Sequence, residues 1–181
     1  IADGNEVWVA EFYGLDLWAA VRIPKNGFFV AANRARIDHI DFNDHENYMY
    51  SPNLKSFAVE NGLWSEASGI PFSPAEIYAP YEGTYSTRRE WRAFDLVAPS
   101  LKLDPNATRF PLYVVPERKL TVQDILEIKS DYYNGTQYDL SRTLDAGPYG
   151  DPLAPFHKER SINLFRTCYV MIANVKAWLP D

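Results

Sequence analysis

Apolar and polar residues alternate along the first part of the chain, which is the pattern of β-strands with one buried face. Residues 6–12 alternate, and after a short turn the apolar segment 17–23 follows. A second turn leads to another apolar segment, residues 28–33. Three consecutive strands joined by tight turns predict an antiparallel meander over residues 1–33.

The middle of the chain carries helix signals separated by polar loops. Residues 34–50 are acidic and predict a loop, and a short strand is predicted over residues 112–115. Ser51 and Thr121 suit the capping position of a helix, because a side-chain oxygen there accepts an unpaired backbone N–H. Capping residues and helical spacing together predict helices over residues 51–61, from 73, over 86–98 and over 121–133.

The last part of the chain opens with a loop rich in glycine and proline, residues 136–155. Residues 160–178 are rich in β-branched and aromatic residues, and we interpret them as one long strand, although a helix also fits their composition. The order of sheet, helices and sheet predicts an α+β fold. In it, a helical and loop insertion of about residues 48–155 interrupts an antiparallel sheet.

Composition narrows the possible functions. The chain has 181 residues, which fit one domain or a large part of one. A net charge of −6 excludes a broad basic face for nucleic acid. No apolar run approaches the roughly 18 residues that span a bilayer. Because Cys168 is the single cysteine, no disulfide forms within the chain.

An acidic loop over residues 38–47 is the one candidate for metal binding, since carboxylate and imidazole groups are common ligands. Its ionisable residues are Asp38, His39, Asp41, Asp44, His45 and Glu46. Their spacing matches neither a calcium loop nor a zinc site. A solvated loop is the better interpretation, and we predict no metal.

Five other residues are candidates for catalysis or ligand binding. Cys168 could act as a nucleophile with His157, but a cysteine in an apolar strand is more often a small buried hydrophobe. Asn33 ends a predicted strand, where an amide either caps the sheet edge or donates to an oxyanion. Arg160 and Arg166 bracket the start of the last predicted strand, and each either forms an internal salt bridge or binds a carboxylate.

Several segments resemble one family in order along nearly the whole chain. They are GNEVWVAEFYGLDLWAAVRIPKNGFFVAANRARI, SPNLKSFAVENGLW, RREWR, DYYNGTQYDLSRTLDAGPYGDP and ERSINLFRTCYV. Together they resemble the middle of the dipeptidase A-like cysteine peptidases, which belong to the N-terminal-nucleophile hydrolases. The resemblance implies a four-layer α-β-β-α sandwich, a dipeptide or short peptide substrate, and no metal or organic cofactor.

The resemblance also implies a mechanism. The family's nucleophile is a cysteine at the mature N-terminus, and the α-amine of that cysteine acts as the general base. By resemblance Asn33 helps to form the oxyanion site. Either Arg160 or Arg166 matches an arginine that orients the nucleophile, and Asn163 competes for that match.

The chain departs from the family pattern at the nucleophile, because it begins with Ile1 and Cys168 takes the place of a small hydroxyl residue. We therefore expect an internal piece that is inactive alone and pairs with the rest of its parent chain or with a second copy. An exported parent is expected by resemblance. Two alternatives stay open: an acylase acting on other linear amides, and a non-catalytic module that binds carbohydrate through exposed tryptophans. Buried Trp8, Trp18 and Trp91 would weaken the second.

Overall fold

The computed structural model describes residues 1–155, 159–176 and 178. Helices occur together with antiparallel strand pairs, so the predicted α+β class is confirmed. The chain divides into two compact units. The first comprises Ile1–Glu82, Pro111–Val114 and Val175–Asp181, and the second comprises Gly83–Phe110 and Val115–Asn174.

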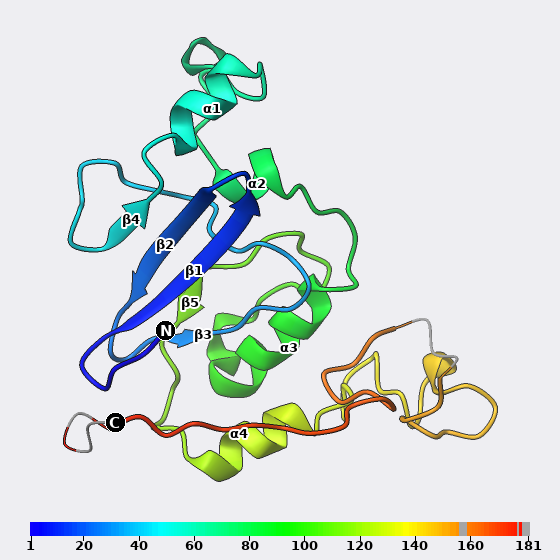
Figure 1. The fold of residues 1–181 in the computed structure, drawn as a ribbon. Coiled ribbons are helices and arrows are strands. Elements are labelled where there is room, and N and C mark those ends of the chain that lie inside the picture. The colour runs from blue at the N-terminus through cyan, green and yellow to red at the C-terminus, as the bar shows by residue number, and fades with distance from the viewer. Residues whose placement is uncertain (156–158, 177, 179–181) are drawn as a thin grey trace. The chain divides into compact units, whose positions relative to one another are not determined.

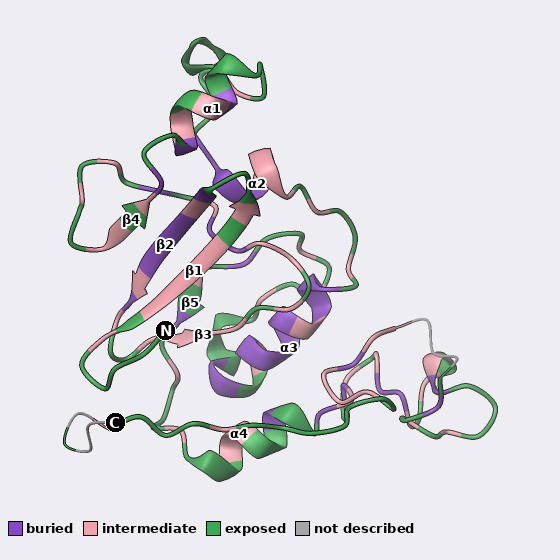
Figure 2. Cartoon of the chain, in the orientation of Figure 1, coloured by how far each residue is buried: buried purple, intermediate pink, exposed green. Residues whose placement is uncertain are grey.

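The larger sheet of the first unit is built on a long hairpin. Strands β1 (Val7–Gly14) and β2 (Leu17–Ile23) pair antiparallel, and β4 (Tyr48–Tyr50) pairs with the other edge of β2 (Figure 1). The hairpin turn places Leu15 and Asp16 at φ of 51° and 61°, the left-handed geometry that matches the twist of the strands. As the central strand, β2 is mostly buried (Figure 2).

The predicted meander of three consecutive strands is wrong at its third strand. Strand β3 covers only Phe28–Phe29 and pairs with β5 (Tyr113–Val114) in a separate two-stranded sheet. The third strand beside β2 is β4, from a segment predicted as loop. A strand of three residues is too short to show alternation, and an apolar pattern reports a buried face, not the neighbour that it pairs with.

The core of the first unit lies on one face of β2. Its buried members come from β2, from the loop after β3, from helix α1 and from the segment before helix α2: Leu17, Ala19, Val21, Ile37, Ile40, Leu54, Ala58 and Phe72. Glu11 on β1 fixes that loop, because its carboxylate accepts the backbone N–H groups of Arg36 at 2.6 Å and Ile37 at 3.0 Å.

Two helices of the first unit were predicted, and one of the predicted caps is wrong. Helix α2 (Pro74–Tyr78) begins where it was expected, and the Ser73 side chain caps it. Helix α1 (Leu54–Glu60) starts later than expected, because Ser51 does not cap it. The Ser51 hydroxyl instead accepts the Trp18 N–H at 3.2 Å, and the Ser51 N–H donates to the Trp18 carbonyl at 3.0 Å. Ser51 therefore ties the chain to β2. The short 3₁₀ helix η1 (Glu66–Ser68) follows α1.

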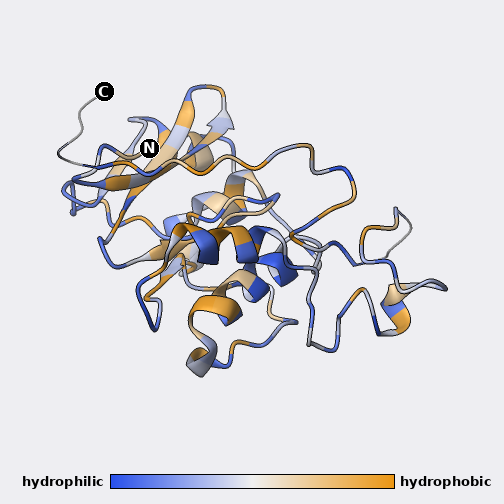
Figure 3. Ribbon diagram, turned by 90° about the horizontal axis from the view of Figure 1, so that it is seen from below, coloured by the Kyte–Doolittle hydropathy of each residue, from blue (hydrophilic) through white to orange (hydrophobic). Residues whose placement is uncertain are grey.

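The second unit is built around two predicted helices, α3 (Thr87–Val97) and α4 (Val122–Lys129). In α4 the predicted cap is confirmed: Thr121 and Asp124 form a reciprocal capping box. The short 3₁₀ helices η2 (Pro99–Leu101) and η3 (Leu144–Ala146) complete it. Hydrophobic and hydrophilic positions lie side by side along the helical ribbons, as amphipathic packing requires (Figure 3). Among the described residues, no helix has the length and apolar character needed to cross a membrane.

The long strand predicted over residues 160–178 is wrong for the described residues of that segment, which form no strand or helix. A strand is stabilised by the hydrogen bonds that it exchanges with a neighbouring strand. Nothing in the described residues pairs with this segment as a strand, and composition alone could not reveal that.

A substitution at Leu54 tests the core of the first unit. Its side chain is 0% exposed, so Leu54→Ala leaves a cavity and should reduce the free energy of unfolding by about 3 kcal/mol. Urea denaturation measures this change. Leu63→Ala is the matched control, because Leu63 is 51% exposed and should lose much less. Equal losses in both variants would contradict this core.

Candidate functional site

Helix α3 carries charged residues on its buried side. Arg88 is 6% exposed and Arg92 is 7% exposed. The two are four residues apart and therefore share one face of the helix. Burying a guanidinium is costly unless its donors are paired, so the partners of these arginines organise the unit.

Arg92 binds the chain just after α4 through hydrogen bonds and an ion pair. Its Nε lies 3.0 Å from both carboxylate oxygens of Asp131, and its Nη2 lies 2.8 Å from Oδ2, so one edge of the guanidinium is filled by one carboxylate. Its Nη1 donates to Asp95 at 3.0 Å. Burial works against the charged form, but hydrogen bonds and charge from Asp131 outweigh it, and the pKa of Arg92 is raised. This pair fixes the position of residue 131.

Arg88 holds a later segment. Its Nη1 lies 3.2 Å from the Glu159 carboxylate, and its guanidinium lies 3.7 Å from the ring centroid of Tyr138. Burial raises the pKa of Glu159, and the neighbouring Arg88 opposes that shift. The pair brings residue 159 and its neighbour Arg160 to α3.

Arg160 is held from two sides. The Tyr133 hydroxyl donates to the Arg160 carbonyl at 2.5 Å, and the Arg160 Nη1 donates to the Tyr85 hydroxyl. The Arg160 Nε is buried and has no hydrogen-bond partner in the described part of the chain. These residues border a cavity of about 200 Å³, here called the arginine cavity, whose lining includes Tyr85, Leu140, Glu159, Arg160, Ser161 and Arg166.

The structure brings two of the three predicted site residues together. Arg160 and Arg166 both line the arginine cavity. Arg166 is exposed, and its guanidinium lies 5.6 Å from the ring centroid of Phe165. Asn33 is exposed at a bend after β3 and belongs to the other unit. A joint role for Asn33 and the arginines therefore stays a prediction.

Cys168 is not the buried strand residue that its apolar neighbours suggested. It is exposed, and its Sγ lies 3.4 Å from the Arg166 carbonyl oxygen. His157, its suggested partner, lies outside the described residues. Their pairing is therefore not tested.

The acidic loop folds on itself. Asp44 accepts the backbone N–H groups of Glu46 and Asn47 at 3.1 Å each and the Asn47 side-chain amide at 2.9 Å. These hydrogen bonds, led by the side-chain amide, lower the pKa of Asp44. Within the described ranges, no three His, Cys, Asp or Glu residues are grouped so that they could hold a metal ion.

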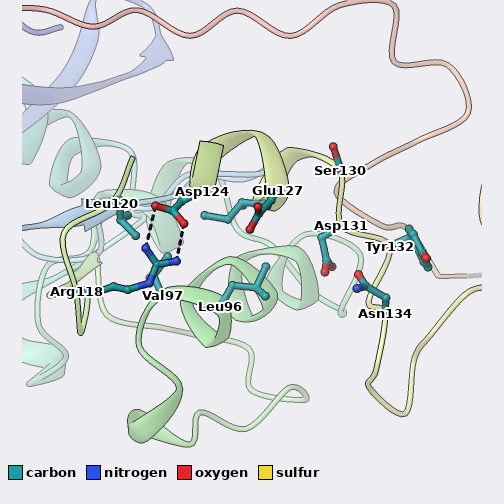
Figure 4. A pocket seen from close by; sticks show the side chains of 11 residues that line it. Leu96, Val97, Arg118, Leu120, Asp124, Glu127, Ser130, Asp131, Tyr132 and Asn134 are labelled. Atoms are coloured by element: carbon teal, nitrogen blue, oxygen red, sulfur yellow. Dashed lines mark hydrogen bonds and ion pairs between the residues drawn. The ribbon is translucent and has the colours of Figure 1, made fainter. Parts of the chain in front are cut away.

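A second cavity of the same unit, of about 380 Å³, lies between α4 and the end of α3 (Figure 4). Two of its three acidic residues are paired with arginines: Arg118 binds Asp124 with Nη1 at 2.9 Å, and Asp131 binds Arg92, whereas Glu127 is exposed. The side chains of Arg118 and Asp124 point toward each other in Figure 4. None of the three predicted site residues lines this cavity.

Two important residues, Tyr85 and Asp131, were not singled out from the sequence. Asp131 pairs with a residue 39 positions away, and Tyr85 pairs with one 75 positions away. Local spacing cannot show such partners. One signal was present: Arg88 and Arg92 lie on the same face of a helix that was predicted correctly, and charges on a packed face require partners.

Comparison with known proteins decides the family. The model of peptidase family C69 matches residues 1–181. The chain belongs to this family. The predicted family resemblance is therefore confirmed.

The family's curated relatives carry peptidase names. A probable dipeptidase from Salmonella dublin is 34% identical over 99% of this chain and 40% of its own length. A probable dipeptidase from Latilactobacillus sakei is 32% identical, over 99% and 37% respectively. The dipeptidase A of Lactobacillus helveticus is 27% identical over the same shares. The chain thus spans about two fifths of the length of these relatives.

Substitutions at the Arg92–Asp131 pair test whether this ion pair stabilises the second unit. Asp131→Asn should reduce the free energy of unfolding by about 3 kcal/mol, because it removes the buried carboxylate from the Arg92 guanidinium and leaves only the half-exposed Asp95. Asp95→Asn removes the other carboxylate at Arg92, but that side chain is 30% exposed and the loss should stay below about 1 kcal/mol. Thermal unfolding of both variants compares them, and a larger loss for Asp95→Asn would refute this assignment.

Proposed function

We propose that this chain forms part of a thiol dipeptidase that hydrolyses dipeptides or short peptides. The match of all 181 residues to a peptidase family, with relatives named dipeptidases, supports this proposal most strongly. The enzyme is proposed to have the α-β-β-α sandwich of the N-terminal-nucleophile hydrolases, with its antiparallel sheet partly supplied by this chain.

The proposed reaction follows the family's chemistry. The α-amine of the N-terminal cysteine takes the proton of its own thiol, and the resulting thiolate attacks the peptide carbonyl. The carbonyl oxygen becomes an oxyanion, and Asn33 is proposed to donate to it. When the C–N bond breaks, the released amine takes the proton, and water then hydrolyses the thioester. Arg160 or Arg166 is proposed to orient the nucleophile. The reaction needs no metal and no organic cofactor.

Two observations support these roles. Asn33 is exposed at the end of an apolar segment, so a substrate can reach it. Arg160 and Arg166 border one cavity. An acylase acting on other linear amides would use the same groups and differs only in its substrate pocket. The binding-module alternative is weaker: Trp91 is buried, although Trp8 and Trp18 are only partly so.

The outer strands of the larger sheet, β1 and β4, suggest how the chain completes its fold. Edge strands carry backbone groups that can pair with a further strand. We propose that they pair with the rest of the parent chain or with a second copy.

Hydrolysis of a dipeptide panel tests the proposed function. A protein with the full length of the relatives should cleave dipeptides, whereas Cys168→Ala should leave that turnover within about twofold, because Cys168 is not the proposed nucleophile. The same panel is offered to the 181-residue chain alone, which we expect to be inactive. If the full-length protein hydrolyses none of the dipeptides, the proposal is wrong. Turnover lost with Cys168→Ala would make Cys168 the nucleophile.

The role of Asn33 has its own test in the full-length protein. Asn33→Ala should lower kcat roughly 100-fold with little change in KM, because an oxyanion donor acts mainly in the transition state. Asn26→Ala is the control, since Asn26 is an exposed turn residue. Unchanged kcat in Asn33→Ala would remove Asn33 from the site.

A further inference from the structure

We propose that Asn134 is a site of spontaneous covalent modification. The backbone nitrogen of Gly135 displaces ammonia from the Asn134 side chain, and water opens the resulting succinimide to aspartate or isoaspartate. In this step Asp139 acts as the base, and Arg92 stabilises the charge that develops. The inference is independent of the proposed function.

The peptide group between Asn134 and Gly135 is bound by a charged side chain on each side. The Gly135 N–H donates to the Asp139 carboxylate at 2.9 Å, and the Asn134 carbonyl accepts the Arg92 Nη2 at 2.9 Å. The nitrogen becomes a nucleophile when it loses its proton, and resonance then places negative charge on the carbonyl oxygen. A carboxylate at the N–H can take this proton, and a guanidinium at the oxygen stabilises the anion.

The base is ionised and fixed in place. Burial works against the charged form of Asp139, but hydrogen bonds from Ser141 and from the Gly135 N–H outweigh it, and the pKa of Asp139 is lowered. The Asp139 residue is only 3% exposed. A carboxylate that is held directly against the N–H therefore stands ready to accept its proton.

The Asn134 side chain is free to reach the nitrogen. Asn134 is exposed, and its side-chain amide forms no hydrogen bond in the described part of the chain. Gly135 has no β-carbon that could hinder the approach of the Asn134 Cγ. Asn134 also lines the cavity between α4 and the end of α3, so water can reach the succinimide (Figure 4).

The reaction needs no reactant besides water. A bond forms between the Gly135 nitrogen and the Asn134 Cγ while the N–H proton passes to Asp139. The bond from Cγ to Nδ2 then breaks, and the leaving nitrogen takes the proton and departs as ammonia. Water finally cleaves one of the two C–N bonds of the imide. Cleavage at Cγ gives aspartate, and cleavage at the backbone carbonyl carbon gives isoaspartate.

Two other Asn–Gly pairs of the chain serve as internal comparisons. The sequence has three such pairs, and the other two are Asn26–Gly27 and Asn61–Gly62. Their glycine N–H groups donate to backbone carbonyls, Gly27 to Pro24 at 2.7 Å and Gly62 to Val59 at 3.1 Å. A neutral carbonyl is a far weaker base than a carboxylate. The base is therefore particular to the third pair.

The modification alters a contact of the buried ion pair. In isoaspartate the main chain runs through the former side chain and is longer by one carbon atom. The carbonyl that Arg92 binds then becomes a free carboxylate, which competes with Asp131 for the same guanidinium. The product should therefore be less stable than the unmodified protein.

Peptide mapping by mass spectrometry tests the proposal. The 181-residue chain is incubated in neutral buffer, and the loss of ammonia is followed at each Asn–Gly pair. Asn134 should be converted roughly tenfold faster than Asn26 or Asn61, or more, because general-base catalysis contributes at least that much. Equal or slower conversion at Asn134 would overturn the proposal. In urea the contacts are lost, so the three rates should converge, and a persistent lead of Asn134 would assign its rate to local sequence and overturn the role of the fold.

A substitution of the base separates catalysis from protection. Asp139→Asn keeps an acceptor for the Gly135 N–H but removes the base, so Asn134 should slow to the rate of the other two pairs. Glu127→Gln, a change at an exposed carboxylate of the same unit, should leave the rate unchanged. Faster conversion of Asn134 with unchanged Asn26 and Asn61 would show that Asp139 protects the bond, which would overturn its role as base. If Asp139→Asn unfolds, all three pairs accelerate together, and the wild-type comparison in buffer and in urea decides.

The effect on stability has its own control. Asn134→Gln keeps the backbone carbonyl for Arg92, but its longer side chain must close a larger ring and cyclises far more slowly. Thermal unfolding after incubation should show a lower midpoint for the wild-type chain and an unchanged midpoint for Asn134→Gln. Equal losses in both would contradict the proposed weakening of the ion pair.

Discussion

The second unit depends on the buried ion pair between Arg92 and Asp131. A guanidinium on a packed helix face is stable only with its counter-charge, and Asp131 supplies this charge from just beyond α4. The Asp131 carbonyl in turn accepts the Asn163 N–H at 2.8 Å. Asp131 therefore joins α3, the end of α4 and the segment that carries the candidate arginines.

In the first unit, charged side chains are paired with neutral backbone groups. The Glu11 carboxylate holds two backbone N–H groups of the loop after β3, and buried Arg36 donates to the Pro111 carbonyl at 2.7 Å. Loops without regular structure are fixed here by side chains that satisfy their backbone groups. Such anchoring keeps Asn33, which lies in that loop, at a defined place within its unit.

Two arginines of the second unit, Arg92 and Arg160, differ in how their donors are paired. Arg92 is saturated by carboxylates of the protein, so it is structural. Arg160 lines the arginine cavity, and its buried Nε has no hydrogen-bond partner in the described residues.

The sequence by itself determined the local elements and the family. The hairpin of β1 and β2, the start of α4 at Thr121 and the extent of α3 follow from alternation, capping and helical spacing, which act between near neighbours. The order of segments along the chain was enough to identify the family. Only the tertiary structure decided the partners: β4 beside β2, Ser51 on Trp18, Asp131 on Arg92 and Tyr85 on Arg160. Those contacts join residues 33 to 75 positions apart or separate strands, and local periodicity contains no information about which distant group satisfies a buried donor.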